Sequence, residues 1–273
     1  MRFVWLAAAL GMALGAGLEP REIVRRSVAA AEGRNADLAL GYNYVERLRT
    51  RDFDGQGAVR SVSSKTHEVL MLDGTPFRLL IEENGKGITP AEQRRHEVEI
   101  RKTAEARRGE TPAERSARQS ALEKQRNKFR KAIWEIPEAF NFRLTGEEIV
   151  NSRPVWVIEA TPRPGYQPAD RFSKLFTQVK GKLWVDQSDY HWTRVDAELL
   201  DTVTFGWILV RIHGGSRVSL TQVRVNDEVW VPQRMSYRVS LRLGLVKLSD
   251  TAMEATYSDY RKASSDPRLA PAR

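Results

Sequence analysis

Residues 229–241 alternate between apolar and polar side chains with a period of two. The apolar positions are Val229, Val231, Met235, Tyr237, Val239 and Leu241. Arg234, Ser236, Arg238 and Ser240 occupy positions between them. This period is that of a β-strand with one apolar face and one Arg-rich face. A sheet built from such strands meets water on one side, so a helix, a closed barrel or a ligand must cover its other side.

Similar strand patterns recur along most of the chain, separated by Gly, Pro, Asn and Asp turns. They cover residues 38–51, 58–72, 77–83, 142–150, 155–161, 181–186, 191–200, 204–213, 217–226 and 251–261. Residues 172–180 fit a short helix or a strand equally well. About ten strands with few helices predict a mainly β (α+β) fold, with one curved antiparallel sheet and helices on its concave face.

Three helices are expected. Residues 20–32 form an amphipathic pattern that begins at Pro20 and ends before Gly33. The sequence Thr-Pro-Ala-Glu occurs at 89–92 and again at 111–114. In each copy Thr supplies the N-cap, Pro the first helical position, and Glu the return contact of a capping box. We therefore expect a helical hairpin, with helices at about 90–108 and 112–136, ended by Pro137.

The N-terminus has the layout of a secretory signal peptide. A cationic Met1-Arg2 start precedes an apolar run from Phe3 to Leu18, within which Gly15, Ala16 and Gly17 are small. The run is short for a membrane anchor, which usually needs about 20 apolar residues. We expect cleavage after residue 17 and an exported, soluble, periplasmic protein, with an uncleaved anchor as the alternative.

The chain is basic, with 44 Lys and Arg against 35 Asp and Glu. Most of this excess lies in residues 90–131, which contain 13 Lys and Arg against 7 Glu. One interpretation is a solvated charged excursion without a binding role. The other is a lid or arm that contacts an anionic membrane surface or partner. Its contact residues would be Arg94, Arg95, Arg101, Arg107, Arg108, Arg115 and Arg118. Because we expect the protein to be exported, we expect no nucleic-acid partner.

Residues with the spacing of a catalytic or metal site are not found in the sequence. There is no Cys, and the four histidines, His67, His96, His191 and His213, are scattered. The hydrolase elbow Gly-x-Ser-x-Gly and the phosphate-binding glycine loops are absent. The carboxylates at 186, 189, 196 and 201 fit solvated turn residues better than a catalytic pair. We therefore expect no enzyme activity, no metal and no cofactor.

Six aromatic residues lie in the second half of the chain: Trp156, Trp184, Trp192, Phe205, Trp207 and Trp230. Residues 204–213 are apolar on both faces, which predicts a central strand covered on both sides. Its aromatic residues either pack in an ordinary core or line a cavity for an acyl chain. The candidate cavity residues are Trp184, Phe205, Trp207, Leu209, Met235 and Tyr237.

Four segments carry a resemblance to a known family. They are Lys-Gly-Lys-Leu-Trp-Val-Asp at 180–186 followed by Trp-Thr-Arg-Val-Asp-Ala at 192–197, then Trp-Val-Pro-Gln-Arg-Met at 230–235, and Tyr-Ser-Asp-Tyr at 257–260. They resemble the periplasmic lipoprotein-localisation carriers, the LolA/LolB-like superfamily that includes the RseB-type sensor domain. The resemblance implies a half-barrel whose apolar concave interior holds acyl chains under covering helices.

Two functions remain open on this basis, because fold alone does not choose between them. The first is a non-enzymatic carrier or binder of lipid or acylated protein, similar to outer-membrane lipoprotein sorting. The alternative is an envelope protein-binding or sensor module that uses the basic hairpin and has no lipid cargo. The expected organisation is a signal peptide at 1–17, one LolA-like domain at 18–262 with the hairpin insertion at about 89–136, and a disordered tail at 263–273.

Overall fold

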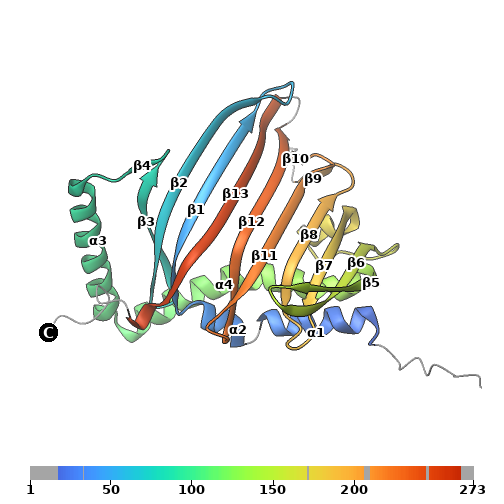
Figure 1. Ribbon diagram of the computed structural model, residues 1–273, viewed down its shortest axis with the longest axis horizontal. Coiled ribbons are helices and arrows are strands. Elements are labelled where there is room, and N and C mark those ends of the chain that lie inside the picture. The colour runs from blue at the N-terminus through green and yellow to red at the C-terminus, as the bar shows by residue number, and fades with distance from the viewer. Residues whose placement is uncertain (1–17, 33, 171, 206–209, 244–245, 266–273) are drawn as a thin grey trace, which may run out of the picture.

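A computed structural model describes residues 18–32, 34–170, 172–205, 210–243 and 246–265 of the chain. Within them, a large antiparallel sheet has the strand order β4-β3-β2-β1-β13-β12-β11-β8-β7-β6-β5, and its two end strands do not meet (Figure 1). The strands are β1 Tyr42–Phe53, β2 Val59–Leu72, β3 Thr75–Glu83, β4 Lys86–Gly87, β5 Phe140–Val150, β6 Arg153–Pro162, β7 Val179–Asp186, β8 Trp192–Leu199, β9 Val203–Phe205, β10 Val210–Ile212, β11 Arg217–Val225, β12 Val229–Leu243 and β13 Val246–Lys262. The predicted fold class, an open and curved antiparallel sheet with helices, is confirmed.

The helices lie along one side of this sheet and at one of its edges (Figure 1). The α-helices are α1 Pro20–Glu32, α2 Arg34–Ala39, α3 Pro90–Gly109 and α4 Pro112–Ala139, and two short 3-10 helices are η1 Ser173–Gln178 and η2 Ala263–Ser265. Among the described residues, no helix combines the length and the apolar character needed to cross a membrane. The predicted signal peptide at 1–17 lies outside the described residues.

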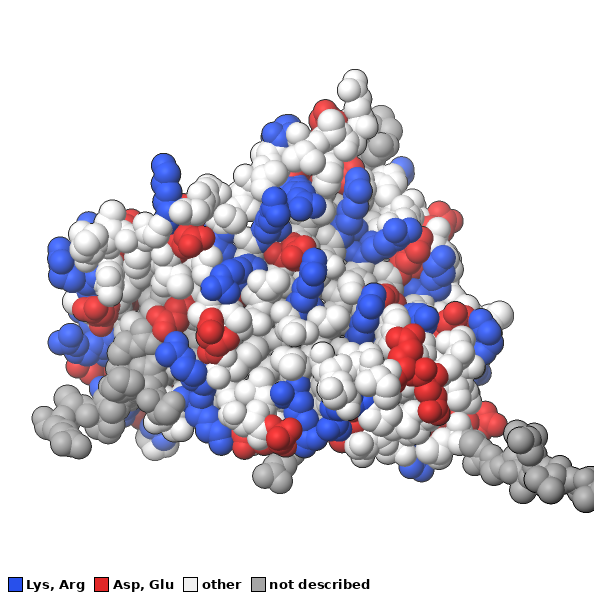
Figure 2. Space-filling model, in the orientation of Figure 1, with Lys and Arg blue, Asp and Glu red and all other residues white. Residues whose placement is uncertain are grey.

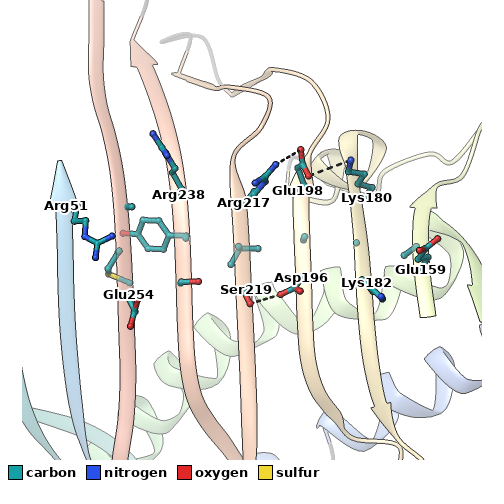
Figure 3. A pocket seen from close by; sticks show the side chains of 18 of the residues that line it. Arg51, Glu159, Lys180, Lys182, Asp196, Glu198, Arg217, Ser219, Arg238 and Glu254 are labelled. Atoms are coloured by element: carbon teal, nitrogen blue, oxygen red, sulfur yellow. Dashed lines mark hydrogen bonds and ion pairs between the residues drawn. The ribbon is translucent and has the colours of Figure 1, made fainter. Parts of the chain in front are cut away.

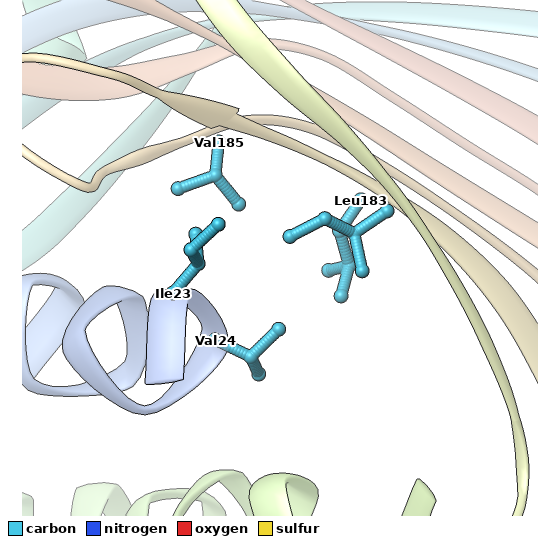
Figure 4. Packing of buried hydrophobic residues seen from close by; sticks show 5 residues of the cluster. Ile23, Val24, Leu183 and Val185 are labelled. Carbon is cyan, nitrogen blue, oxygen red and sulfur yellow. The ribbon is translucent and has the colours of Figure 1, made fainter. Parts of the chain in front are cut away.

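The packing of α1 fixes which face of the sheet is turned toward the helices. Ile23 and Val24 of α1 are buried against Ile158, Leu183 and Val185 of β6 and β7 (Figure 4). Neighbouring strand residues point to opposite faces. We call the face that carries Ile158 and Leu183 the helix-side face, and the opposite face the outer face.

Strand pairing carries this division across the sheet. Leu183 is paired with Val195, Val195 with Leu220, and Leu220 with Met235, so all four share the helix-side face. In each strand the residue adjacent to one of these four points to the opposite face. These adjacent residues, Lys182, Asp196, Ser219 and Ser236, form the corresponding row on the outer face. The apolar and Arg-rich faces predicted for residues 229–241 are therefore real faces of the sheet.

Both predicted capping boxes are present. The Thr89 and Thr111 hydroxyls accept from the backbone N–H of Glu92 and Glu114, and each carboxylate contacts the backbone N–H of its threonine. The two helices, however, take different directions (Figure 1). Ile100 of α3 is buried on the sheet edge against Leu70 and Leu79, while α4 runs across the sheet toward α1. The two helices therefore diverge instead of packing side by side as a hairpin, although most of their residues are exposed.

Pro137 does not end α4, which continues to Ala139. Pro137 and Ala139 are both buried, and Ala139 packs with Phe140 and Ala160. A proline in the interior of a helix removes one backbone hydrogen bond. Here it stands within the last turn, where packing holds the remaining residues in helical geometry.

Two further expectations are corrected. Residues 204–213 are not one central strand: Phe205 pairs with Val210, so the chain reverses between β9 and β10, and β10 continues the sheet beside the end of β12. Residues 38 and 39, expected at the start of a strand, are instead the end of α2 (Arg34–Ala39), because Leu38 and Ala39 pack against the cluster of Val229 and Val231. Residues 172–180, open between helix and strand, contain η1.

Candidate functional site

An apolar hollow of about 390 Å³ lies between α4 and the helix-side face. Its volume is within the range of small-molecule sites. Its walls come from the end of α2 and the residue after it, from β1, β2, β3, β12 and β13, and from α4. The lining residues are Ala39, Leu40, Tyr44, Met71, Pro76, Leu122, Arg126, Val231, Pro232, Tyr257 and Tyr260. Segments from both ends of the described chain thus meet at this site.

Three tyrosines form one wall of the hollow. The ring centroid of Tyr44 lies 5.9 Å from that of Tyr257 and 5.5 Å from that of Tyr260. The Tyr260 hydroxyl donates to the Pro232 carbonyl at 2.6 Å. Burial raises the pKa of Tyr257 to about 12 and also raises the pKa values of Tyr44 and Tyr260. All three are neutral at physiological pH, and they present ring carbon together with a few polar atoms.

Polar groups stand beside this wall and at its rim. Glu46, opposite Tyr257 in the β1–β13 register, is buried and accepts from the Nε of Arg78 at 3.1 Å. Arg126 of α4 is exposed where it lines the hollow, and its Nη2 donates to the Gly74 carbonyl at 3.4 Å. A cation at the rim of an apolar hollow suits an amphipathic ligand with an anionic end.

The helix-side face continues beyond the hollow as a row of apolar side chains that are neither buried nor fully exposed. We call it the apolar tract: Leu48, Met235, Tyr237, Val218, Leu220 and Met253. Val218 is its most open member, at 38% exposure. Figure 1 shows this part of the sheet extending past α1, α2 and α4. The described helices therefore cover this apolar surface only in part.

The structure separates the residues predicted from sequence to line a cavity. Met235 and Tyr237 lie in the apolar tract. Trp184 lies on the outer face: Arg194 lies over its ring with the guanidinium carbon 4.5 Å from the ring centroid, and its Nε1 donates to Glu148 at 2.9 Å. The backbone of Phe205 forms the last position of β9, and Trp207 and Leu209 lie outside the described residues.

The prediction from sequence did not include Tyr44, Tyr257, Tyr260 or Leu122 among the lining residues. The signal was present in part, since Tyr44, Glu46 and Leu48 alternate in the segment that forms β1. No pattern within the sequence, however, states that β1 pairs with β13, which is what brings Tyr44 and Tyr257 together.

The basic residues of the two middle helices differ in their surroundings. Arg118 is only 13% exposed and binds Glu110 and Asp73, and Arg107 also binds Glu110 at 2.7 Å. The other predicted contact residues are exposed: Arg94, Arg95, Arg101, Arg108 and Arg115. Two of the seven cations are thus held by carboxylates of the protein, and five face solvent.

The titratable groups near the β7–β8 turn have structural partners. The buried Asp186 binds Arg153, with Nη2–Oδ1 2.8 Å, and accepts from the backbone N–H of Ser188. His191 is stacked on Trp230 with centroids 5.3 Å apart, and burial lowers its pKa. In the described part of the chain, no three His, Asp or Glu side chains are grouped as metal ligands would be.

Comparisons with known proteins give matches of structure. No family model and no curated protein matches the chain. A putative outer membrane lipoprotein-sorting protein domain from Vibrio parahaemolyticus matches with 14% identity and a TM-score of 0.35, over 89% of this chain and 91% of that one. A LolA superfamily protein from Nitrosomonas europaea matches with 12% identity and a TM-score of 0.30, over 90% and 94%.

A third match is the lipoprotein LppX from Mycobacterium tuberculosis, with 11% identity and a TM-score of 0.28, over 88% of this chain and 93% of that one. At these identities, and with TM-scores of 0.28 to 0.35, the three matches are similarities from which no role of this chain follows.

Proposed function

We propose that the protein is a non-enzymatic carrier or binder of lipid or acylated protein, working as an exported protein of the bacterial periplasm. The observation that carries the proposal is the apolar hollow under α4 together with the apolar tract beside it. An acyl chain would enter between Leu122 and Tyr257 and continue along the tract.

The physical driving force is burial of hydrocarbon. Each methylene moved out of water contributes about 0.8 kcal/mol. Ordering of the chain and of the lining side chains offsets part of this gain. Ten buried methylenes would therefore supply up to about 8 kcal/mol before those costs, enough for specific binding. Arg126 at the rim would bind an anionic head group.

The test is direct. Native mass spectrometry of the purified protein should detect a co-purified lipid, and delipidated protein should bind a fluorescent fatty acid. Leu122→Asp places a charge in the hollow, whereas Ala121→Asp places the same charge on the exposed side of the same helix. We expect at least tenfold weaker binding for the first and no change for the second. Delipidated wild-type protein without affinity, or equal affinity of both variants, contradicts the proposal.

The second candidate is an envelope protein-binding or sensor module without lipid cargo. One observation favours it: α3 stands at the sheet edge with Arg94, Arg95 and Arg101 exposed (Figure 1). If the protein carries no lipid but retains an acidic partner that Arg94→Glu/Arg101→Glu releases, this function replaces the first.

A further inference from the structure

The outer face of the sheet carries a groove of about 800 Å³, on the side away from α1 and α4. It crosses seven strands, from β1 to β6, and lies between two rows of side chains (Figure 3). The first row contains Arg51, Ala252, Arg238, Arg217, Glu198 and Lys180. The second contains Arg49, Glu254, Ser236, Ser219, Asp196, Lys182 and Glu159.

The carboxylates of the groove are already neutralised by the protein. Glu198 is shared by Lys180 at 3.6 Å and Arg217 at 3.5 Å. Asp196 binds Arg194 at 2.6 Å and accepts from the Ser219 hydroxyl. The remaining two, Glu254 and Glu159, bind Arg234 and Arg143.

Several cations of the groove are left without such a partner. Arg49 and Arg51 make no ion pair within the described part of the chain. The Arg238 guanidinium lies over the Phe53 ring, 4.5 Å from its centroid, and Lys182 lies over Trp184. The groove is therefore electropositive, and Figure 2 shows Lys and Arg gathered over the middle of this face.

The first row also contains an arrangement that does not favour folding. Arg217 and Arg238 are directly opposite each other on β11 and β12. Like charges at such positions destabilise a sheet. Arg51 and Arg238 flank the small Ala252 from both sides, which leaves space between two guanidinium groups. A bound anion would relieve this repulsion.

The shape of the groove limits what that anion can be. Seven strands at about 4.8 Å spacing give a length of about 29 Å, which an extended peptide of about eight residues spans. A flat membrane reaches the tops of both rows but not the floor between them. The second row offers carboxylates and the Ser219 and Ser236 hydroxyls beside its cations. Such a mixture matches a polypeptide, whose backbone both donates and accepts, better than a polyphosphate, which only accepts.

We propose that this outer-face groove binds an acidic segment of a partner polypeptide in extended conformation, with Arg51, Arg238 and Arg217 contacting its carboxylates. The site is separate from the lipid site, since it lies on the opposite face of the sheet. The peptide-binding proposal and the lipid-binding proposal can therefore be tested separately, and either can be wrong while the other holds.

The experiment measures fluorescence anisotropy of a fluorescein-labelled (Glu-Ser)4 peptide with the full-length protein at low salt. Arg51→Glu/Arg238→Glu should weaken binding at least tenfold. Arg60→Glu/Lys124→Glu changes net charge equally at exposed positions outside the groove, and should change binding less than twofold. Because Arg238→Glu faces Arg217, we expect the groove variant to unfold at no lower a temperature than wild type. Arg51→Ser/Arg238→Ser replaces it if it fails to fold.

Each of the following results would overturn the proposal: no binding of the acidic peptide by wild-type protein, equal losses in the groove and control variants, or binding of phosphatidylglycerol vesicles with the same dependence on Arg51 and Arg238. The last result would assign the groove to a membrane surface instead. A (Lys-Ser)4 peptide that binds as well as (Glu-Ser)4 would also contradict it.

Discussion

Arg118 binds both carboxylate oxygens of Glu110, with Nε–Oε1 2.9 Å and Nη2–Oε2 2.8 Å. The same guanidinium contacts the Asp73 carboxylate in the turn between β2 and β3, and donates to the Thr75 hydroxyl at 3.2 Å. One side chain thus connects the junction of α3 and α4 to the sheet. This connection holds the first half of α4, whose Leu122 closes the apolar hollow.

The pH dependence of this junction follows from Glu110. Hydrogen bonds from Arg118 and then Arg107 lower its pKa to about 2. A carboxyl with a depressed folded pKa contributes stability that is fully present above its unfolded pKa and is lost as pH falls through the folded value. The contribution should therefore disappear between about pH 4.5 and pH 2. Thermal unfolding of wild type and Glu110→Gln should show a difference at pH 6 that vanishes at pH 2. A constant difference would contradict the assignment.

The apolar tract should take part in lipid binding. Met235→Asp places a charge on the helix-side face, whereas Ser236→Asp places it one residue away on the outer face. Fluorescent fatty acid titration should give at least tenfold weaker binding for Met235→Asp, because a carboxylate is costly to desolvate beside an acyl chain. Ser236→Asp should bind as wild type does. Equal behaviour of the two variants would confine the lipid site to the hollow.

The contact of α1 with the sheet should be a main source of stability. Ile23 is buried at 1% exposure, and Ile149 is 72% exposed. Ile23→Ala should lower the free energy of unfolding by about 3 kcal/mol, since it removes buried methyl groups and leaves a cavity. Ile149→Ala should change it by less than about 0.5 kcal/mol. Urea unfolding followed by tryptophan fluorescence measures both, and similar losses would show that α1 is not docked as described.

The second capping box can be tested in the same way. Thr111 accepts from the Glu114 backbone N–H at 3.3 Å, and Glu114 returns a contact to the Thr111 backbone. Thr111→Ala should cost about 1 kcal/mol. Thr111→Ser, which keeps the hydroxyl, should recover most of it. Hydrogen exchange of the first turn of α4 localises the effect, and unchanged exchange in Thr111→Ala would show that the cap contributes nothing.

Local signals predicted the elements well where one interaction decided the outcome. The repeated Thr-Pro-Ala-Glu sequence was enough to place the starts of α3 and α4, because a capping box is formed by four consecutive residues. Pro137 misled the prediction of the end of α4, because packing of Ala139 against Phe140 and Ala160 competes with the lost hydrogen bond.

Alternation predicted the face of the sheet on which Met235 and Tyr237 lie, and failed for Trp184. Met235 and Tyr237 follow a clear period of two, and they share the helix-side face. At 183–185 all three residues are apolar, so the period does not say which of them point toward the helices. The outer face is apolar there because Val150, Val155 and Val157 form a second small cluster around Trp184.

The sequence by itself determined that a strand-rich chain would have one apolar and one Arg-rich face, since side-chain direction in a strand is set by local backbone geometry. Only the tertiary structure decided what each face encloses. Tyr44 meets Tyr257 because β1 pairs with β13, and Arg51 reaches Arg238 across the small Ala252 for the same reason. Pairing between distant strands depends on how the whole sheet buries its apolar surface, which no local pattern encodes.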